Sequence, residues 1–151
     1  MPFIIPYFLL ILSSLAGYSP AFSQAGYQKL TEEEIKSAPL KTAQSLADAM
    51  LTAQKKGKAY EFSEPEATPT MREENSPEKQ LQTYSAIHEL FGDYQSLTFV
   101  EAYQSTTKPI YRIFRFRGKF ERGTPQPEVR VVLNEQAQLA GFEMRPWEDP
   151  L

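Results

Sequence analysis

The spacing of apolar residues changes once along this chain, and that change constrains the fold more than any other feature. Before Gly92 apolar residues recur at intervals of three and four, the period of an amphipathic helix. After Gly92 they alternate with polar residues, the period of a half-buried strand. Helices followed by antiparallel strands indicate an α+β fold. We therefore expect a curved antiparallel sheet of four or more strands, wrapped on two or three N-terminal helices in a cone-like arrangement.

Two helices are predicted in the first third of the chain. Residues 31–34 read Thr-Glu-Glu-Glu, a capping-box spacing, and predict a short helix within an N-terminal extension of residues 24–39. Pro39 suits the start of a second helix, and Gly57 suits its end. The predicted buried stripe of the second helix is Leu40, Ala43, Leu46, Ala47, Met50 and Leu51.

A third helix is predicted immediately before Gly92. Ser76 as N-cap and Pro77 at the first helical position mark its start. Residues 61–75 precede it; they are acidic, contain proline and lack a period, so we expect a long, mobile surface loop. The predicted apolar stripe of the third helix is Leu81, Tyr84, Ile87, His88 and Phe91.

Four strands are predicted after Gly92, over residues 96–104, 110–116, 128–133 and 139–144. A turn at Thr106 and Thr107 would set Glu101 opposite Arg112 on one face of the first hairpin. The apolar pairs predicted on that face are Tyr103 with Ile110, Phe99 with Phe114, and Leu97 with Phe116.

The second predicted hairpin also has a register that pairs opposite charges and apolar residues. A turn around Gln136 and Ala137 sets Arg130 opposite Glu143 on one face. The apolar pairs predicted on the other face are Val129 with Met144, Val131 with Phe142, and Leu133 with Ala140.

The first 23 residues predict a secretory signal peptide. They carry an apolar run and no charged side chain, and Ala21, Phe22 and Ser23 suit cleavage before Gln24. A retained membrane anchor is the alternative; Pro6 interrupts the apolar run, which falls short of the roughly 20 residues that a span needs. We favour cleavage, and thus an exported protein, periplasmic or extracellular, with no stable membrane span.

The composition of the chain excludes several classes of site. Its 151 residues include no Cys and one His, which excludes a disulfide scaffold, a thiolate metal site and a cysteine nucleophile. We expect no metal site and no cofactor. No catalytic triad, phosphate-binding glycine loop or paired-carboxylate spacing is present, so no residue is assigned a catalytic role.

Residues 91–94 (Phe-Gly-Asp-Tyr), the strand segment 111–120 and the terminal hairpin 129–142 carry a resemblance to a known family. In their order and apolar spacing they resemble the nuclear transport factor 2-like (ketosteroid isomerase-like) superfamily, and its small exported domains of unknown function most of all. The resemblance implies a domain over residues 40–147, followed by a tail over residues 148–151. It implies an α+β cone around an apolar pocket, which that superfamily uses for enzymes, ligand binding and dimerisation. A cystatin-like fold is the alternative, and the second long helix counts against it.

Five residues are candidates for binding a ligand in that pocket: Tyr84, His88, Glu101, Tyr103 and Arg112. His88 is the only imidazole and can act as a base near neutral pH; its alternative role is packing beside the sheet. Charges on a core-facing strand must be paired or meet water. Glu101 and Arg112 would thus either line the pocket mouth, with Arg112 holding a carboxylate, or neutralise each other. The strand of Glu101 and Tyr103 does not match the isomerase motif, so isomerase chemistry is not carried over.

The second predicted strand is basic. Residues 108–130 hold seven basic and two acidic side chains, whereas residues 24–104 hold eight basic and thirteen acidic ones. The whole chain is acidic, with a net charge of −3, so we do not expect nucleic acid as a partner. A solvated strand face is one interpretation of this strand, and a homodimer interface on the outer sheet face is another. The candidate interface residues are Val100, Tyr111, Ile113 and Arg115.

The sequence therefore predicts an exported single domain that binds a small apolar or amphipathic ligand, or a protein partner, without chemistry of its own. Enzymatic activity stays uncertain. A small isomerase or lyase that uses a pocket His or Glu is one alternative. A structural dimerisation module, with its cone filled by Phe99, Phe114 and Tyr103, is the other.

Overall fold

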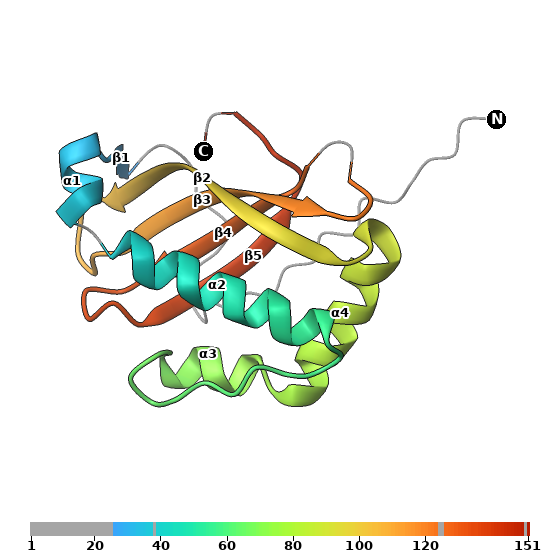
Figure 1. The fold of residues 1–151 in the computed structure, drawn as a ribbon. Coiled ribbons are helices and arrows are strands. Elements are labelled where there is room, and N and C mark those ends of the chain that lie inside the picture. The colour runs from blue at the N-terminus through green and yellow to red at the C-terminus, as the bar shows by residue number, and fades with distance from the viewer. Residues whose placement is uncertain (1–25, 38, 124–125, 150) are drawn as a thin grey trace.

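The computed structural model describes residues 26–37, 39–123, 126–149 and 151. The predicted signal peptide, residues 1–23, lies outside these residues. Within the described residues the chain is α+β, as predicted, with four helices and a five-stranded antiparallel sheet in the order β1-β2-β3-β4-β5 (Figure 1). The elements are β1 (Tyr27–Lys29), α1 (Glu32–Ser37), α2 (Leu40–Lys55), α3 (Pro69–Glu74), α4 (Pro77–Phe91), β2 (Tyr94–Ser105), β3 (Arg112–Phe120), β4 (Glu128–Leu133) and β5 (Leu139–Arg145).

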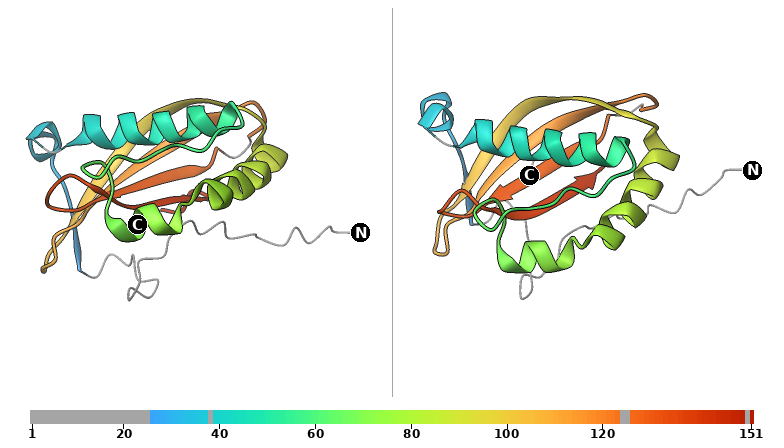
Figure 2. Two further views of the ribbon diagram at one scale, coloured as in Figure 1. Left: turned by 90° about the horizontal axis from the view of Figure 1, so that it is seen from below. Right: turned by 60° about the horizontal axis from the view of Figure 1, so that its bottom comes forward.

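The sheet is curved and has two different faces. Helix α2 crosses its inner face, with α3 and α4 beside it on the same side (Figures 1 and 2). The main core lies between α2 and the sheet. Met50 from α2 belongs to the same buried cluster as Phe114, Phe116 and Phe142, all without exposed surface. A smaller apolar cluster lies on the outer face, under the last residues of the chain. None of the described helices combines the length and apolar character that a membrane span requires.

The first two helices form as their sequence signals predict. At α1, the backbone N–H of Thr31 donates to Glu34 Oε2 at 2.7 Å, and the N–H of Glu34 donates to Thr31 Oγ1 at 3.2 Å. This reciprocal pair is a capping box. On α2 the buried residues are Ala43, Leu46, Ala47, Met50, Leu51 and Gln54, which include all of the predicted stripe except half-buried Leu40.

The buried face of α4 differs from the predicted one. Its buried residues are Gln80, Thr83 and Ile87, whereas Leu81 and His88 are exposed. Gln80 explains the difference: its amide exchanges hydrogen bonds with the backbone of Tyr60 at 2.8 and 2.9 Å and so fixes the loop before the helix. Burying an amide side chain costs little free energy when all its hydrogen-bond partners are present. A prediction from the spacing of apolar residues cannot identify such a buried polar residue.

Residues 61–75 are not the predicted unstructured loop, because they contain α3. Thr68 caps this helix by accepting a hydrogen bond from the Met71 N–H at 3.2 Å, and Pro69 occupies the first turn. Met71 is buried against the core. Thr68 also donates its N–H to the carbonyl of Leu139 at 3.0 Å, which ties this segment to the edge of β5.

The β4–β5 hairpin confirms the predicted register over most of its length. Val129 pairs with Met144, Val131 with Phe142, and Arg130 with Glu143. The last predicted pair is wrong, since Leu133 lies opposite Leu139 rather than Ala140. A register shift after Val132 turns Ala140 to the outer face and brings Leu139 into the main core.

The predicted register of the β2–β3 hairpin is wrong. The connection is longer than the predicted two-residue turn: the N–H of Ser105 donates to the carbonyl of Tyr111 at 2.9 Å, and β3 begins at Arg112. The pairing consequently shifts by three residues at this end. The observed pairs include Tyr103 with Ile113, Ala102 with Phe114, Glu101 with Arg115, Phe99 with Phe116, and Leu97 with Gly118.

A bulge between Phe99 and Glu101 decides which face each β2 side chain occupies. Phe99 and Ala102 both join the main core, although strict alternation would put them on opposite faces. The prediction that Glu101 and Tyr103 face the core is therefore wrong, and both lie on the outer face. Ala102, the next residue after Glu101, is fully buried in the core.

Candidate functional site

The structure does not bring the five predicted ligand residues together. Tyr84 and His88 lie on α4 with their ring centroids 5.6 Å apart. The Tyr84 hydroxyl donates to the carbonyl of Lys55 at 3.2 Å. His88 Nε2 lies 3.3 Å from Asp93 Oδ1, and both side chains are nearly half exposed. The His88–Asp93 pair therefore lies at the surface near the end of α4.

Arg112 and Glu101 are not partners, contrary to the prediction. Arg112 Nε donates to Gln104 Oε1 at 3.0 Å at the end of the hairpin. Glu101 instead contacts Lys29 Nζ at 2.9 Å and the guanidinium of Arg115. Tyr103 donates its hydroxyl to Glu101 Oε1 at 3.3 Å. The prediction missed Lys29 because β1 has only three residues and no clear alternation.

Charged side chains cover much of the outer sheet face, and we call this group the outer ion cluster. At its centre, Arg115 and Glu128 are both without exposed surface and contact each other directly. Arg130 Nη2 lies 3.0 Å from Glu128 Oε2. The outer ion cluster consists of Lys29, Glu101, Arg115, Glu128, Arg130, Glu143 and Arg145.

The last residues of the chain cover this cluster. The guanidinium groups of Arg115 and Arg117 each lie over the Trp147 ring, 4.2 Å from its centroid. Arg115 Nη2 also donates to the backbone carbonyl of Glu148. Leu151 packs against the outer apolar cluster of Tyr103, Ile113, Val132 and Ala140. We call residues 146–149 together with Leu151 the C-terminal strap.

Three of the four residues of the predicted dimer interface lie on the sheet face that the C-terminal strap partly covers. Ile113 and Arg115 are completely buried within one copy of the chain, and Tyr111 is half-buried. Only Val100 stays open, with 39% of its surface exposed. The four residues therefore do not form one exposed patch.

Two carboxyl groups of the outer ion cluster have pKa values shifted in opposite directions. Burial alone would raise the pKa of Glu101, but hydrogen bonds and charges from Lys29 and Arg115 outweigh it and lower that pKa below 4.5. Burial raises the pKa of Glu143 above 4.5, and the more distant charges of Arg130 and Arg145 offset only part of that effect. The cluster therefore favours the charged form of Glu101 and disfavours that of Glu143.

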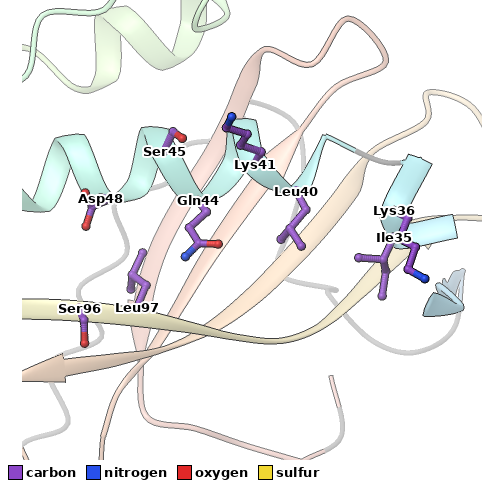
Figure 3. A pocket seen from close by; sticks show the side chains of 9 residues that line it. All are labelled: Ile35, Lys36, Leu40, Lys41, Gln44, Ser45, Asp48, Ser96 and Leu97. Carbon is purple, nitrogen blue, oxygen red and sulfur yellow. The ribbon is translucent and has the colours of Figure 1, made fainter. Parts of the chain in front are cut away.

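A groove of about 670 Å³ lies on the other side of the molecule, between α1, α2 and β2, and we call it the α2–β2 groove (Figure 3). Its apolar floor is formed by Ile35, Leu40 and Leu97, each half-buried. In Figure 3 the side chains of Leu40 and Gln44 point from α2 toward β2, and Leu97 points from β2 toward α2. The polar residues that complete its lining are Lys36, Lys41, Gln44, Ser45, Asp48 and Ser96.

The charges of the α2–β2 groove are not balanced. It contains two lysines, Lys36 and Lys41, and one carboxylate, Asp48. Tyr94 donates its hydroxyl to Asp48 Oδ1 at 2.7 Å. Burial and the hydrogen bond to Asp48 together raise the pKa of Tyr94 well above its ordinary value. The groove thus combines an apolar floor with available positive charge.

A second groove, of about 510 Å³, lies on the other side of α2. It is bounded by the loop before α3, and its residues include Tyr60, Glu66 and Ala137. Glu66 accepts hydrogen bonds from the Tyr60 hydroxyl at 2.8 Å and from the Ser63 N–H at 2.8 Å. The Glu66 carboxylate and the Tyr60 hydroxyl in this groove are thus paired within the protein. Neither groove is lined by a predicted ligand residue.

Across the residues that the structure describes, no group of three or more His, Asp and Glu side chains is placed to hold a metal ion. Comparison of the chain with protein-family models, with curated proteins and with solved structures found no match.

Proposed function

We propose that this chain is an exported, non-catalytic binding protein and that its ligand site is the α2–β2 groove. The observation that carries the proposal is the composition of that groove: Ile35, Leu40 and Leu97 offer an apolar floor, and Lys36 and Lys41 offer positive charge. An apolar floor with a few polar groups is typical of ligand sites. The ligand class that fits is amphipathic, with an apolar body and an anionic group.

The arrangement of the other candidate groups supports binding rather than catalysis. A base and an acid must both reach one substrate. His88 lies at the end of α4, Glu101 under Lys29 on the outer face, and Arg112 at the hairpin end. Element order and the curved sheet also support the proposal that the domain is nuclear transport factor 2-like. Because Phe114 and Phe116 fill the inner face without exposed surface, we place the ligand at the sheet edge instead of inside the cone.

Titration with decanoate, which has an apolar chain and a carboxylate, tests this site. We expect chemical-shift changes of the Leu40 and Leu97 methyl groups in NMR spectra. Gln44→Trp should reduce the affinity about tenfold or more, because an exposed residue that points into the groove would then fill it. Leu90→Trp is the matched control, since Leu90 is 51% exposed on α4 outside the groove. Equal affinities for the two variants would refute the proposed site.

Export is tested separately. The full chain, expressed in a bacterial host, should accumulate outside the cytoplasm and begin at Gln24 in N-terminal sequencing, as small residues before a cleavage site favour. Recovery of the uncleaved chain in the membrane fraction would support the retained anchor instead.

A further inference from the structure

Strand β2 has a long edge that no described strand covers. It runs for 12 residues, yet β1 pairs with only three of them, Tyr103 to Ser105. The N–H of Leu30 then donates to the carbonyl of Ala102 at 2.9 Å, after which the chain turns away into α1. Residues 94–101 consequently have no strand partner on this side among the residues that the structure describes. An uncovered strand edge is a template for another strand.

The uncovered edge borders the α2–β2 groove. Ser96 and Leu97 belong to both, and Figure 3 shows Leu97 directed toward α2. A strand added beyond β2 would therefore direct alternate side chains over the apolar floor while its backbone pairs with the edge. Strand β1 already uses the same edge in antiparallel orientation with three residues.

The irregularities of β2 limit what can be added. Register shifts between Tyr94 and Ser96 and between Phe99 and Glu101 leave residues 96–99 as the regular stretch. Bulges bend an edge and prevent long, flat pairing with another sheet. This length disfavours the β2 edge of a second copy and suits a short, flexible segment.

The charges of the groove give such a segment a direction. Lys36 lies at the α1 end and Asp48 at the opposite end, near Ser96 (Figure 3). An antiparallel strand that continues the line of β1 would begin near Lys36 and finish near Asp48. Opposite charges attract. An acidic residue therefore fits the first position of the added strand, near Lys36, and a basic residue fits its last position, near Asp48.

We infer that the ligand of the α2–β2 groove is an extended peptide segment of a partner protein, which adds antiparallel to residues 96–99 of β2. Its recognition features are an acidic N-terminal residue, apolar side chains at alternate positions and a basic C-terminal residue. This inference rests on the proposed function, because it specifies the amphipathic ligand of the same groove.

The test measures binding of a fluorescent, terminally blocked peptide of sequence EVTVTVK to the protein as it is exported. Two N-methylated forms carry methyl groups on the threonine amides or on the first two valine amides. In an added strand, alternate amides point toward and away from β2. We therefore expect one methylated form to bind at least twentyfold more weakly than the unmethylated peptide, and the other to bind within threefold of it. The reversed sequence KVTVTVE should bind at least fivefold more weakly.

Hydrogen exchange of the β2 amides locates the peptide. We expect new protection within residues 96–99 on addition of EVTVTVK, and loss of that protection in Gln44→Trp but not in Leu90→Trp. Equal binding of the two N-methylated forms, or protection elsewhere, would overturn the inference. Concentration-dependent protection of the same amides without peptide would overturn it in favour of a second copy. Binding of decanoate without binding of the peptide would overturn it and leave the proposed function in place.

Discussion

At the scale of single residues, Arg115 holds the outer sheet face together. Its guanidinium has no exposed surface and meets Glu101, Glu128, the Glu148 carbonyl and the Trp147 ring. Desolvating such a charge is costly, and only closely matched partners offset that cost. Removing one partner is correspondingly harmful, because the remaining charges stay buried.

Arg115→Ala should destabilise the protein by about 3–5 kcal/mol, since Glu128 would remain buried with only its Arg130 and Arg145 contacts. Urea denaturation followed by circular dichroism measures this change. Arg112→Ala is the matched control: Arg112 is half-buried and its contact is with Gln104, so we expect a loss of about 1 kcal/mol or less. Similar losses for both variants would contradict the central position of Arg115.

Glu101 and Glu143 should respond to pH in opposite ways. The folded pKa of Glu101 is lowered, so its stabilising contribution is complete above the unfolded value near 4.5 and disappears as the pH falls through the folded pKa. The folded pKa of Glu143 is raised, so its charged form costs stability at neutral pH, and that cost disappears as the pH falls through the folded pKa toward 4.5.

At pH 7, Glu101→Gln should therefore lower the free energy of unfolding by about 1–2 kcal/mol, whereas Glu143→Gln should be as stable as the parent protein or more stable. The difference in stability between Glu101→Gln and the parent protein should become smaller below pH 4. Urea denaturation of the three proteins at pH 7 and pH 3.5 measures both effects. A loss for Glu143→Gln at pH 7 equal to that of Glu101→Gln would contradict the assigned directions.

At the scale of elements, the bulge in β2 sorts side chains between the two faces of the sheet. It places Val100 as the extra residue between Phe99 and Glu101, opposite Arg115. Without the extra residue, Phe99, Glu101 and Ala102 would alternate inward, outward and inward, which is the arrangement they already have.

Deletion of Val100 should consequently be tolerated, with a loss below about 1 kcal/mol, because it regularises the strand without moving a side chain to the other face. Deletion of Thr98 is the control. It would turn Leu97 away from the core and should cost at least about 2 kcal/mol. Thermal denaturation compares the two deletions. A greater loss for the Val100 deletion would show that the bulge itself is required.

At the scale of the whole molecule, the sheet is covered on both faces. Helix α2 covers the inner face, and the C-terminal strap covers part of the outer face through Trp147 and Leu151. Strap and helices thus pack on opposite faces of the same strands, and β3 contributes to both contacts. Elements that share a packed strand unfold together in a small domain.

Trp147 is the only tryptophan of the chain, so its fluorescence reports on the C-terminal strap alone. We expect its transition in urea to coincide with that of far-UV circular dichroism. Trp147→Leu should lower the stability by about 1–3 kcal/mol, through lost contact with both guanidinium groups. A fluorescence transition at lower urea concentration would show that the strap detaches before the domain unfolds.

The sequence predicted most helices and strands, because their signals are local. The capping box at Thr31, the proline after Ser76 and the alternation in β4 each act within a few residues. Helix α3 was missed although Thr68 and Pro69 carry the same signal as Ser76 and Pro77. The candidate site is predicted least well, because strict alternation puts Glu101 and Tyr103 on the inner face and does not account for the bulge after Phe99.

By itself, the sequence determined the α+β class, the order of the three predicted helices and four predicted strands, and the register of most of β4–β5. Periodicity and charge pairing between neighbouring strands depend only on short spacings. The tertiary structure alone decided the partner of Glu101, the burial of Arg115 and the position of the α2–β2 groove. A connection longer than a tight turn and one extra residue in β2 move side chains between faces without changing the apolar pattern. The C-terminal strap and β1 reach their sites from opposite ends of the chain, and no local spacing records such a contact.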